Sequence, residues 1–115
     1  MFYGHYTIYL QWVSAGISDA IKSVLFCLNN VKIYHMFKNA VDVNTRIANL
    51  ILDFLDDNKN DEKVKSVIAY FIDCFYTDFL IKCAELYNED LIEKLLKSYI
   101  KIALKPVRFV RELGS

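Results

Sequence analysis

The clearest pattern along the chain is a helical spacing of apolar residues between Ala15 and Leu28. Apolar side chains recur at alternating steps of three residues and one, which places them on one face of a helix. The residues that carry this pattern are Ile17, Ala20, Ile21, Val24, Leu25 and Leu28. Ser14 or Ser18 is suited to cap the start of the helix, and the pair Asn29–Asn30 to end it.

A second helix is predicted from Val43 to Leu55, because polar and apolar positions again separate onto two faces. Asp42 or Asn44 is its candidate N-cap. The run from Asp56 to Asp61 is the most polar in the chain and predicts a loop. The apolar face of this helix is formed by Ile47, Leu50, Ile51, Phe54 and Leu55.

A third helix is predicted to begin near Asp61, since the helix dipole favours acidic residues in a first turn. Thr77 and Asp78 are candidate breaks, but neither Gly nor Pro interrupts the segment as far as Leu86. We therefore expect one long helix with a kink. Its apolar face is formed by Val64, Val67, Ile68, Phe71, Ile72, Phe75 and Phe79.

A fourth helix is predicted after Asn88, a capping residue followed by two acidic residues. Pro106 stops or kinks this helix, and a short final helix is expected from Val107 to Leu113. The core face of the fourth helix is assigned to Leu91, Leu95, Tyr99, Ile102 and Ala103. The predicted core of the whole chain is Ile21, Leu25, Ile47, Leu50, Ile51, Phe54, Ile68, Phe71, Phe75, Leu91, Leu95 and Tyr99.

The first 13 residues and the segment from Val31 to Phe37 fit two interpretations. Apolar and polar residues alternate in both, which is typical of strands and allows a strand–helix–strand start. Two short strands alone form a marginal sheet, so the helical remainder of the chain favours helical continuation. The predicted fold is mainly α, a compact bundle of four or five helices in a single domain spanning 1–115, with the N-terminal segment as a short strand in the alternative.

Composition acts mainly by excluding classes of protein. The chain has 115 residues, of which 55% are hydrophobic, and its 14 basic residues match its 14 acidic ones. It is too apolar to be disordered and too balanced to coat nucleic acid by bulk charge. The longest apolar stretch, from Ile8 to Leu28, contains Asp19 and Lys22, so no membrane span is expected.

The cysteines and histidines point away from metal chemistry. Cys27, Cys74 and Cys83 have apolar neighbours and are expected to be buried free thiols, which favours a reducing, cytoplasmic location. The chain has no Cys-x-x-Cys motif, and His5 and His35 are distant from every cysteine. The acidic loop lacks the EF-hand pattern, and no glycine-rich phosphate loop occurs. We therefore expect no cofactor or metal.

Catalysis by serine or cysteine needs a nearby base, and only His5 and His35 are available. No complete catalytic set surrounds either histidine, so the chain is predicted not to be an enzyme and to have no small-molecule substrate.

The C-terminal part of the chain is strongly basic although the net charge is zero. The last 22 residues hold six basic residues against one acidic residue, whereas residues 53–93 hold four against eleven. Four lysines fall within an arc of roughly 80° on a helix. Three interpretations stay open: a solvated face, a docking face for an acidic protein, and a contact surface for phosphate backbones. We call this set the basic stripe: Lys94, Lys97, Lys101, Lys105 and Arg108, continued by Arg111.

Seventeen aromatic residues are many for a chain of this length. Those near the N-terminus, above all Tyr6 and Trp12, exceed what a small bundle hides easily, and surplus aromatics are enriched at protein interfaces. The function predicted from the sequence is a non-enzymatic interaction module that binds a protein partner or itself as a homodimer. The alternative is a nucleic-acid-associated helical subunit of a ribonucleoprotein or viral assembly that uses the basic stripe.

Overall fold

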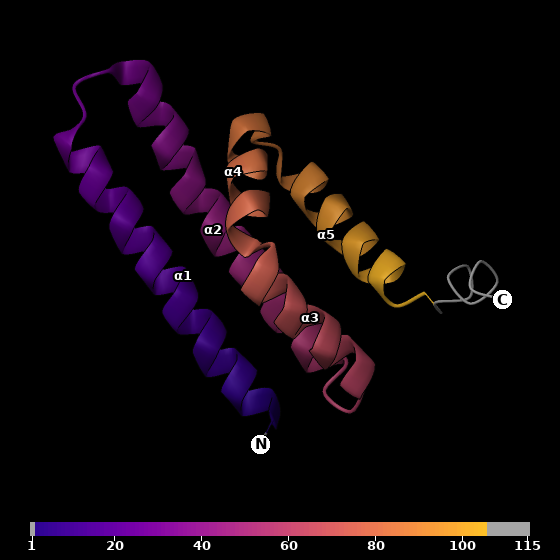
Figure 1. Ribbon diagram of the computed structural model, residues 1–115. Coiled ribbons are helices and arrows are strands. Elements are labelled where there is room, and N and C mark those ends of the chain that lie inside the picture. The colour runs from indigo at the N-terminus through magenta and orange to yellow at the C-terminus, as the bar shows by residue number, and fades with distance from the viewer. Residues whose placement is uncertain (1, 106–115) are drawn as a thin grey trace, which may run out of the picture.

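The computed structural model describes the backbone of residues 2–105 and the side chains of residues 7–105. Within that range the chain is all helical, with five helices and no strand (Figure 1). The helices are α1 (Phe2–Cys27), α2 (Val31–Asp57), α3 (Glu62–Cys74), α4 (Tyr76–Leu86) and α5 (Glu89–Ala103). The predicted mainly α fold is confirmed, and the two ambiguous segments are both helical, in α1 and at the start of α2.

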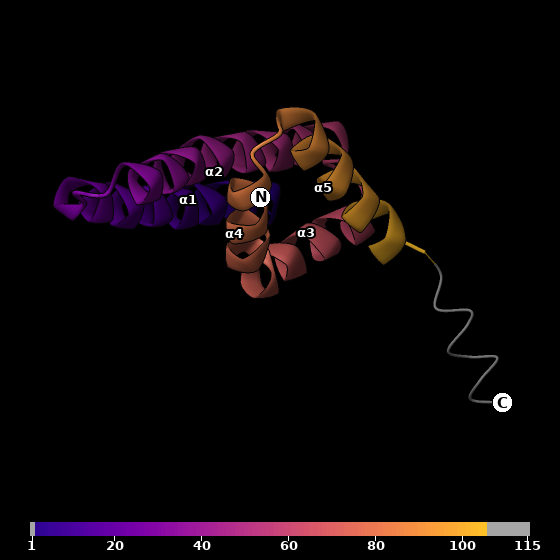
Figure 2. The same ribbon diagram turned by 90° about the horizontal axis from the view of Figure 1, so that it is seen from above.

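The two longest helices form an antiparallel hairpin, and the three shorter ones cover part of it (Figure 1). Seen from above, α3, α4 and α5 gather at one end, while the hairpin's turn at residues 28–30 projects at the other (Figure 2). The described chain is therefore elongated, with extents of 57 × 34 × 23 Å. Its radius of gyration is 16.2 Å, against about 13 Å for a compact domain of this length.

Three helix starts follow the capping chemistry of their first residues. The Asn30 side chain accepts the backbone N–H groups of Lys32 and Ile33 and begins α2. Asp61 caps α3 by accepting the N–H groups of Lys63 and Val64, where the sequence predicts a helix start. Asn88 caps α5, as the sequence predicts, by accepting the N–H of Leu91. The other candidate caps are wrong, because Ser14, Ser18, Asp42 and Asn44 lie inside helices.

The predicted long third helix is wrong, because the chain divides at Phe75 rather than continuing through it. Phe75 has φ −122° and ψ −11°, outside the helical region, and separates α3 from α4. At the far end of α4, Tyr87 has a left-handed φ of 34°. The Tyr87 hydroxyl donates to Asp42 Oδ2 at 3.2 Å, which fixes this turn against α2.

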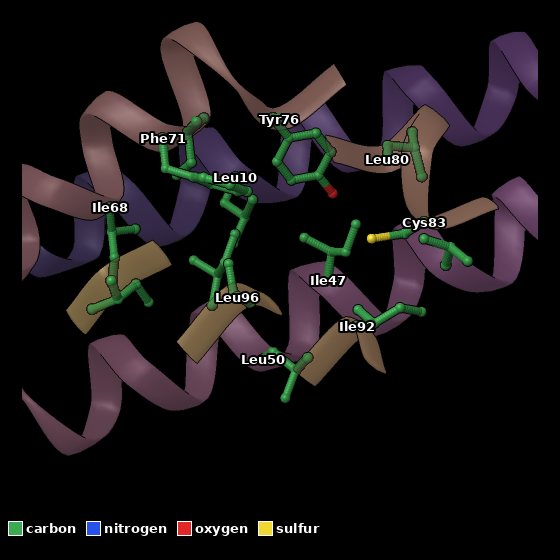
Figure 3. Close-up of a cluster of buried hydrophobic side chains, with 14 of the residues drawn as sticks. Leu10, Ile47, Leu50, Ile68, Phe71, Tyr76, Leu80, Cys83, Ile92 and Leu96 are labelled. Atoms are coloured by element: carbon green, nitrogen blue, oxygen red, sulfur yellow. The ribbon is translucent and has the colours of Figure 1, made fainter. Parts of the chain in front are cut away.

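The buried side chains of all five helices meet in one cluster (Figure 3). On α5 the predicted face is displaced by one position. Apolar residues occupy a wide arc of this helix, so the predicted core face and the buried face are adjacent. The predicted core residues Leu91, Leu95 and Tyr99 are only half-buried. The buried residues are instead Ile92, Leu96 and Ile100, whereas Ile102 and Ala103 are exposed. Phe75 is also exposed, because it stands at the break between two helices.

A buried polar network joins three helices at the centre of the hairpin. Asn44 of α2 is fully buried, and its Nδ2 lies 2.8 Å from Ser14 O and 2.7 Å from Ser18 Oγ of α1. Its Oδ1 accepts the hydroxyl of Tyr76, the first residue of α4. Burial raises the pKa of Tyr76 to about 12, so the hydroxyl keeps its proton at neutral pH. These bonds set how α1 is rotated on α2, and hence which face of α1 points outward.

Candidate interaction surfaces

The outward face of α1 exposes several large apolar side chains. Leu10 and Ile21 point into the core, whereas Ile8, Trp12 and Phe26 lie on the opposite side of the helix. Trp12 is 75% exposed and Phe26 is 93% exposed. A soluble surface rarely leaves such large side chains bare along one helix, so this face has the character of an interface.

Charge is nearly absent from this helix. Its only Asp, Glu, Lys or Arg residues are Asp19 and Lys22, both exposed. They share a shallow open hollow of about 580 Å³ with Ser23, Phe26 and Cys27. The outward face of α1 is thus apolar towards both ends and carries one charge of each sign near its middle.

The two N-terminal aromatics predicted to bind a partner have different outcomes. Trp12 is exposed on the outward face, as an interface residue requires. Tyr6 lies in α1, but its side chain is outside the described residues. Tyr9 is half-covered and turned aside, because its hydroxyl donates to Asp73 Oδ1 at 3.0 Å. That hydrogen bond raises the pKa of Tyr9.

The basic stripe is divided by the structure into free and paired lysines. Lys94, Lys101 and Lys105 are exposed, and no ion pair within the described range involves them. Lys97 instead lies 2.8 Å from Glu93 Oε1. Arg108 and Arg111 are outside the described residues.

Glu93 connects α5 to α2 as well as holding Lys97. Its second oxygen, Oε2, lies 3.1 Å from Nη2 of Arg46 on α2. Lys97, and then Arg46, hold the pKa of Glu93 below its usual value. Lys97 therefore belongs to a contact between helices, and three lysines remain available to an outside anion.

An apolar groove between α2 and α4 is a surface that the sequence pattern did not reveal. Met36, Phe37 and Ala40 form one wall of a hollow of about 270 Å³, and Ile81, Ala84 and Glu85 form the other. Met36 and Ile81 are exposed. The groove exists because α4 crosses α2 short of the hairpin turn, which is a tertiary arrangement without a local signal.

Two of the three cysteines depart from the prediction. Cys83 is buried, and this burial raises its pKa. Cys27 and Cys74 are exposed, because each is the last residue of its helix, and the apolar neighbours Phe26 and Phe75 are exposed as well. All three are free thiols.

Neither a metal site nor a membrane span appears in the part of the chain that the structure describes. No three His, Cys, Asp or Glu side chains gather there in a way that could hold a metal ion. Among helices α1 to α5, none combines the length and the apolar character that crossing a bilayer requires. His35 is exposed, and the side chain of His5 is outside the described residues.

Comparison of the chain with models of known protein families, with curated proteins and with solved structures gives no match.

Proposed function

We propose that this protein is a non-enzymatic interaction module that self-associates through the outward face of α1. The observation that carries the proposal is the exposure of Ile8, Trp12 and Phe26 along one nearly uncharged helix. Aromatic side chains bury about 150–250 Å² each and dominate interface energetics. Covering Trp12 and Phe26 in two copies removes several hundred Å² of apolar surface from water, which favours association.

The first prediction concerns Trp12. Sedimentation equilibrium of the full chain should give a mass above the monomer's 13.4 kDa at micromolar concentration, rising towards twice that value. Trp12→Ser should raise the dimer dissociation constant by at least about tenfold, because large aromatic side chains covered at an interface are typical hot spots. The matched control is Tyr70→Ser, since Tyr70 of α3 is also exposed but lies off this face. A wild-type chain that stays monomeric at 100 μM, or an equal effect of both substitutions, contradicts the proposal.

A second candidate function is binding of a nucleic-acid backbone by the basic stripe. Its support is the exposure of Lys94 and Lys101 on α5, and of Lys105 two residues beyond its end, without a carboxylate partner among the described residues. Phosphate contacts of this kind give affinity that falls steeply with salt.

The prediction for the stripe uses Lys101→Glu combined with Lys105→Glu. If both lysines contact phosphates, the change should flatten the log–log salt dependence of nucleic-acid binding by about 1.8. Glu forms helices as readily as Lys, so the helix content should not change. Lys32→Glu with Lys38→Glu is the control, as it alters charge equally at exposed sites on α2. Absence of binding by the wild-type chain at 50 mM salt rejects this function.

A further inference from the structure

The outward face of α1 has a heptad spacing. One set of its exposed residues recurs at steps of four, three, four, three and four, which is the spacing of the a and d positions that form a coiled-coil seam. The seam residues are Ile8, Trp12, Ala15, Asp19, Lys22 and Phe26, and every one of them is exposed. Because the core-facing side of α1 is formed by other residues, among them Leu10 and Ile21, this seam is not packed against the other described helices.

We propose that α1 pairs along this seam with α1 of a second copy, antiparallel and with Asp19 of each copy opposite Lys22 of the other. The inference rests on the proposed self-association and specifies its partner, direction and register. In an antiparallel pair the a positions of one helix face the d positions of the other. The two-fold axis therefore creates two ion pairs, each between Asp19 of one copy and Lys22 of the other. A parallel pair would instead place Asp19 against Asp19 and Lys22 against Lys22.

The same register also places a large side chain of one copy opposite a small one of the other. It places the small Ala15 of one copy opposite Phe26 of the other, because both pairs are centred on the same point between Ala20 and Ile21. The two α1 helices overlap over residues 14–27, so Trp12 of each copy lies opposite Asn29 in the hairpin turn of the other. Phe26 is the most exposed apolar side chain on α1. Gly16 follows Ala15 and has no side chain, and the space beside it is open, since a Cβ built there meets no described atom within 4 Å. The large side chain of each helix therefore lies over the small residues of the other.

Two charged residues at seam positions also explain how one register is selected. Neither Asp19 nor Lys22 has an ion-pair partner among residues 7–105. Polar residues at a coiled-coil seam cost stability but specify register and orientation. An occupant without complementary charges would leave both groups unpaired as it covered the seam, which favours a second copy over an unrelated apolar helix.

The test is a charge exchange measured by native mass spectrometry and sedimentation of the full-length chains. Asp19→Lys alone makes both paired positions positive, and Lys22→Asp alone makes both negative, so each variant should raise the homodimer dissociation constant at least tenfold. An equimolar mixture of the two variants restores opposite charges in both layers. The mixture should therefore form a heterodimer with a dissociation constant within about threefold of the wild-type value.

The controls separate this pairing from self-association in general. Lys38→Asp changes an exposed charge on α2 away from the seam and should leave the dissociation constant unchanged. Circular dichroism should show the wild-type helix content in every variant, since both seam charges are exposed. If Trp12→Ser disrupts the dimer while the charge variants and their mixture behave as wild type, the register is wrong but the proposed function stands. If the wild-type chain never dimerises, both fail.

Discussion

Replacing Phe71 with alanine is expected to lower the free energy of unfolding by about 3–5 kcal/mol. Phe71 is only 1% exposed and lies at the centre of the aromatic cluster. Its ring centroid is 6.2 Å from that of Tyr76, 5.4 Å from Phe79 and 5.1 Å from Tyr99. The substitution therefore leaves a cavity between α3, α4 and α5. Urea denaturation followed by circular dichroism measures the change.

Two companion variants test the placement of this ring. Tyr70→Ala alters the preceding residue, which is exposed, and should cost less than about 1 kcal/mol. Phe71→Leu keeps most of the buried volume and should be less destabilising than Phe71→Ala, which guards against a variant that fails to fold. Equal losses for Tyr70→Ala and Phe71→Ala would show that the described core is wrong.

The second large effect is expected at Asn44, where alanine should cost about 2–4 kcal/mol. The substitution removes the hydrogen bonds to Ser14 and Ser18 and the short bond that the Tyr76 hydroxyl donates to Oδ1, and it leaves that buried hydroxyl only the backbone carbonyl of residue 44, 3.4 Å away. A buried polar group that loses its partner costs about 1–3 kcal/mol. Thermal and urea unfolding of the variant measure the loss.

A double-mutant cycle distinguishes the network from simple loss of packing. Tyr76→Phe removes only the hydroxyl, and its effect should be much smaller in the Asn44→Ala background than in the wild type. Asn49→Ala is the matched control, because Asn49 is an exposed asparagine on the same helix. Strictly additive effects of the two core substitutions would contradict a direct bond between these side chains.

The parts of the fold that the sequence predicts are those with local causes. On α2 and α3 one face is apolar and the other polar, so periodicity identifies Ile47, Leu50 and Ile68 as core. Asp61 and Asn88 cap the helices that follow them by bonding to backbone groups two or three residues ahead. Such interactions depend only on the neighbouring sequence.

The features that could not be predicted depend on contacts between distant segments. Ser14, Ser18 and Asn44 resemble caps locally, but they lie inside helices because they satisfy one another across the hairpin. α1 is apolar on two faces, one for the core and one exposed, and this second face produces the alternation that suggests a strand. Size and polarity alone do not separate the two faces.

The candidate surfaces also include one feature that the sequence predicts and one that depends on contacts between distant segments. The exposure of Trp12 follows from a surplus of aromatic residues that composition already reveals. Lys97 has the spacing of the stripe, yet Glu93 pairs with it and joins it to Arg46 of α2. The contact between Arg46 and Glu93 joins residues 47 positions apart. The spacing of residues within α5 therefore could not predict it.

The proposal that a second copy covers the outward face of α1 is tested by the fluorescence of Trp12. It is the only tryptophan in the chain and is exposed in the monomer, so its emission reports this face alone. On raising the protein from nanomolar to tens of micromolar concentration, the emission should shift to shorter wavelength and acrylamide quenching should fall. Emission and quenching that stay constant across that range would contradict the claim.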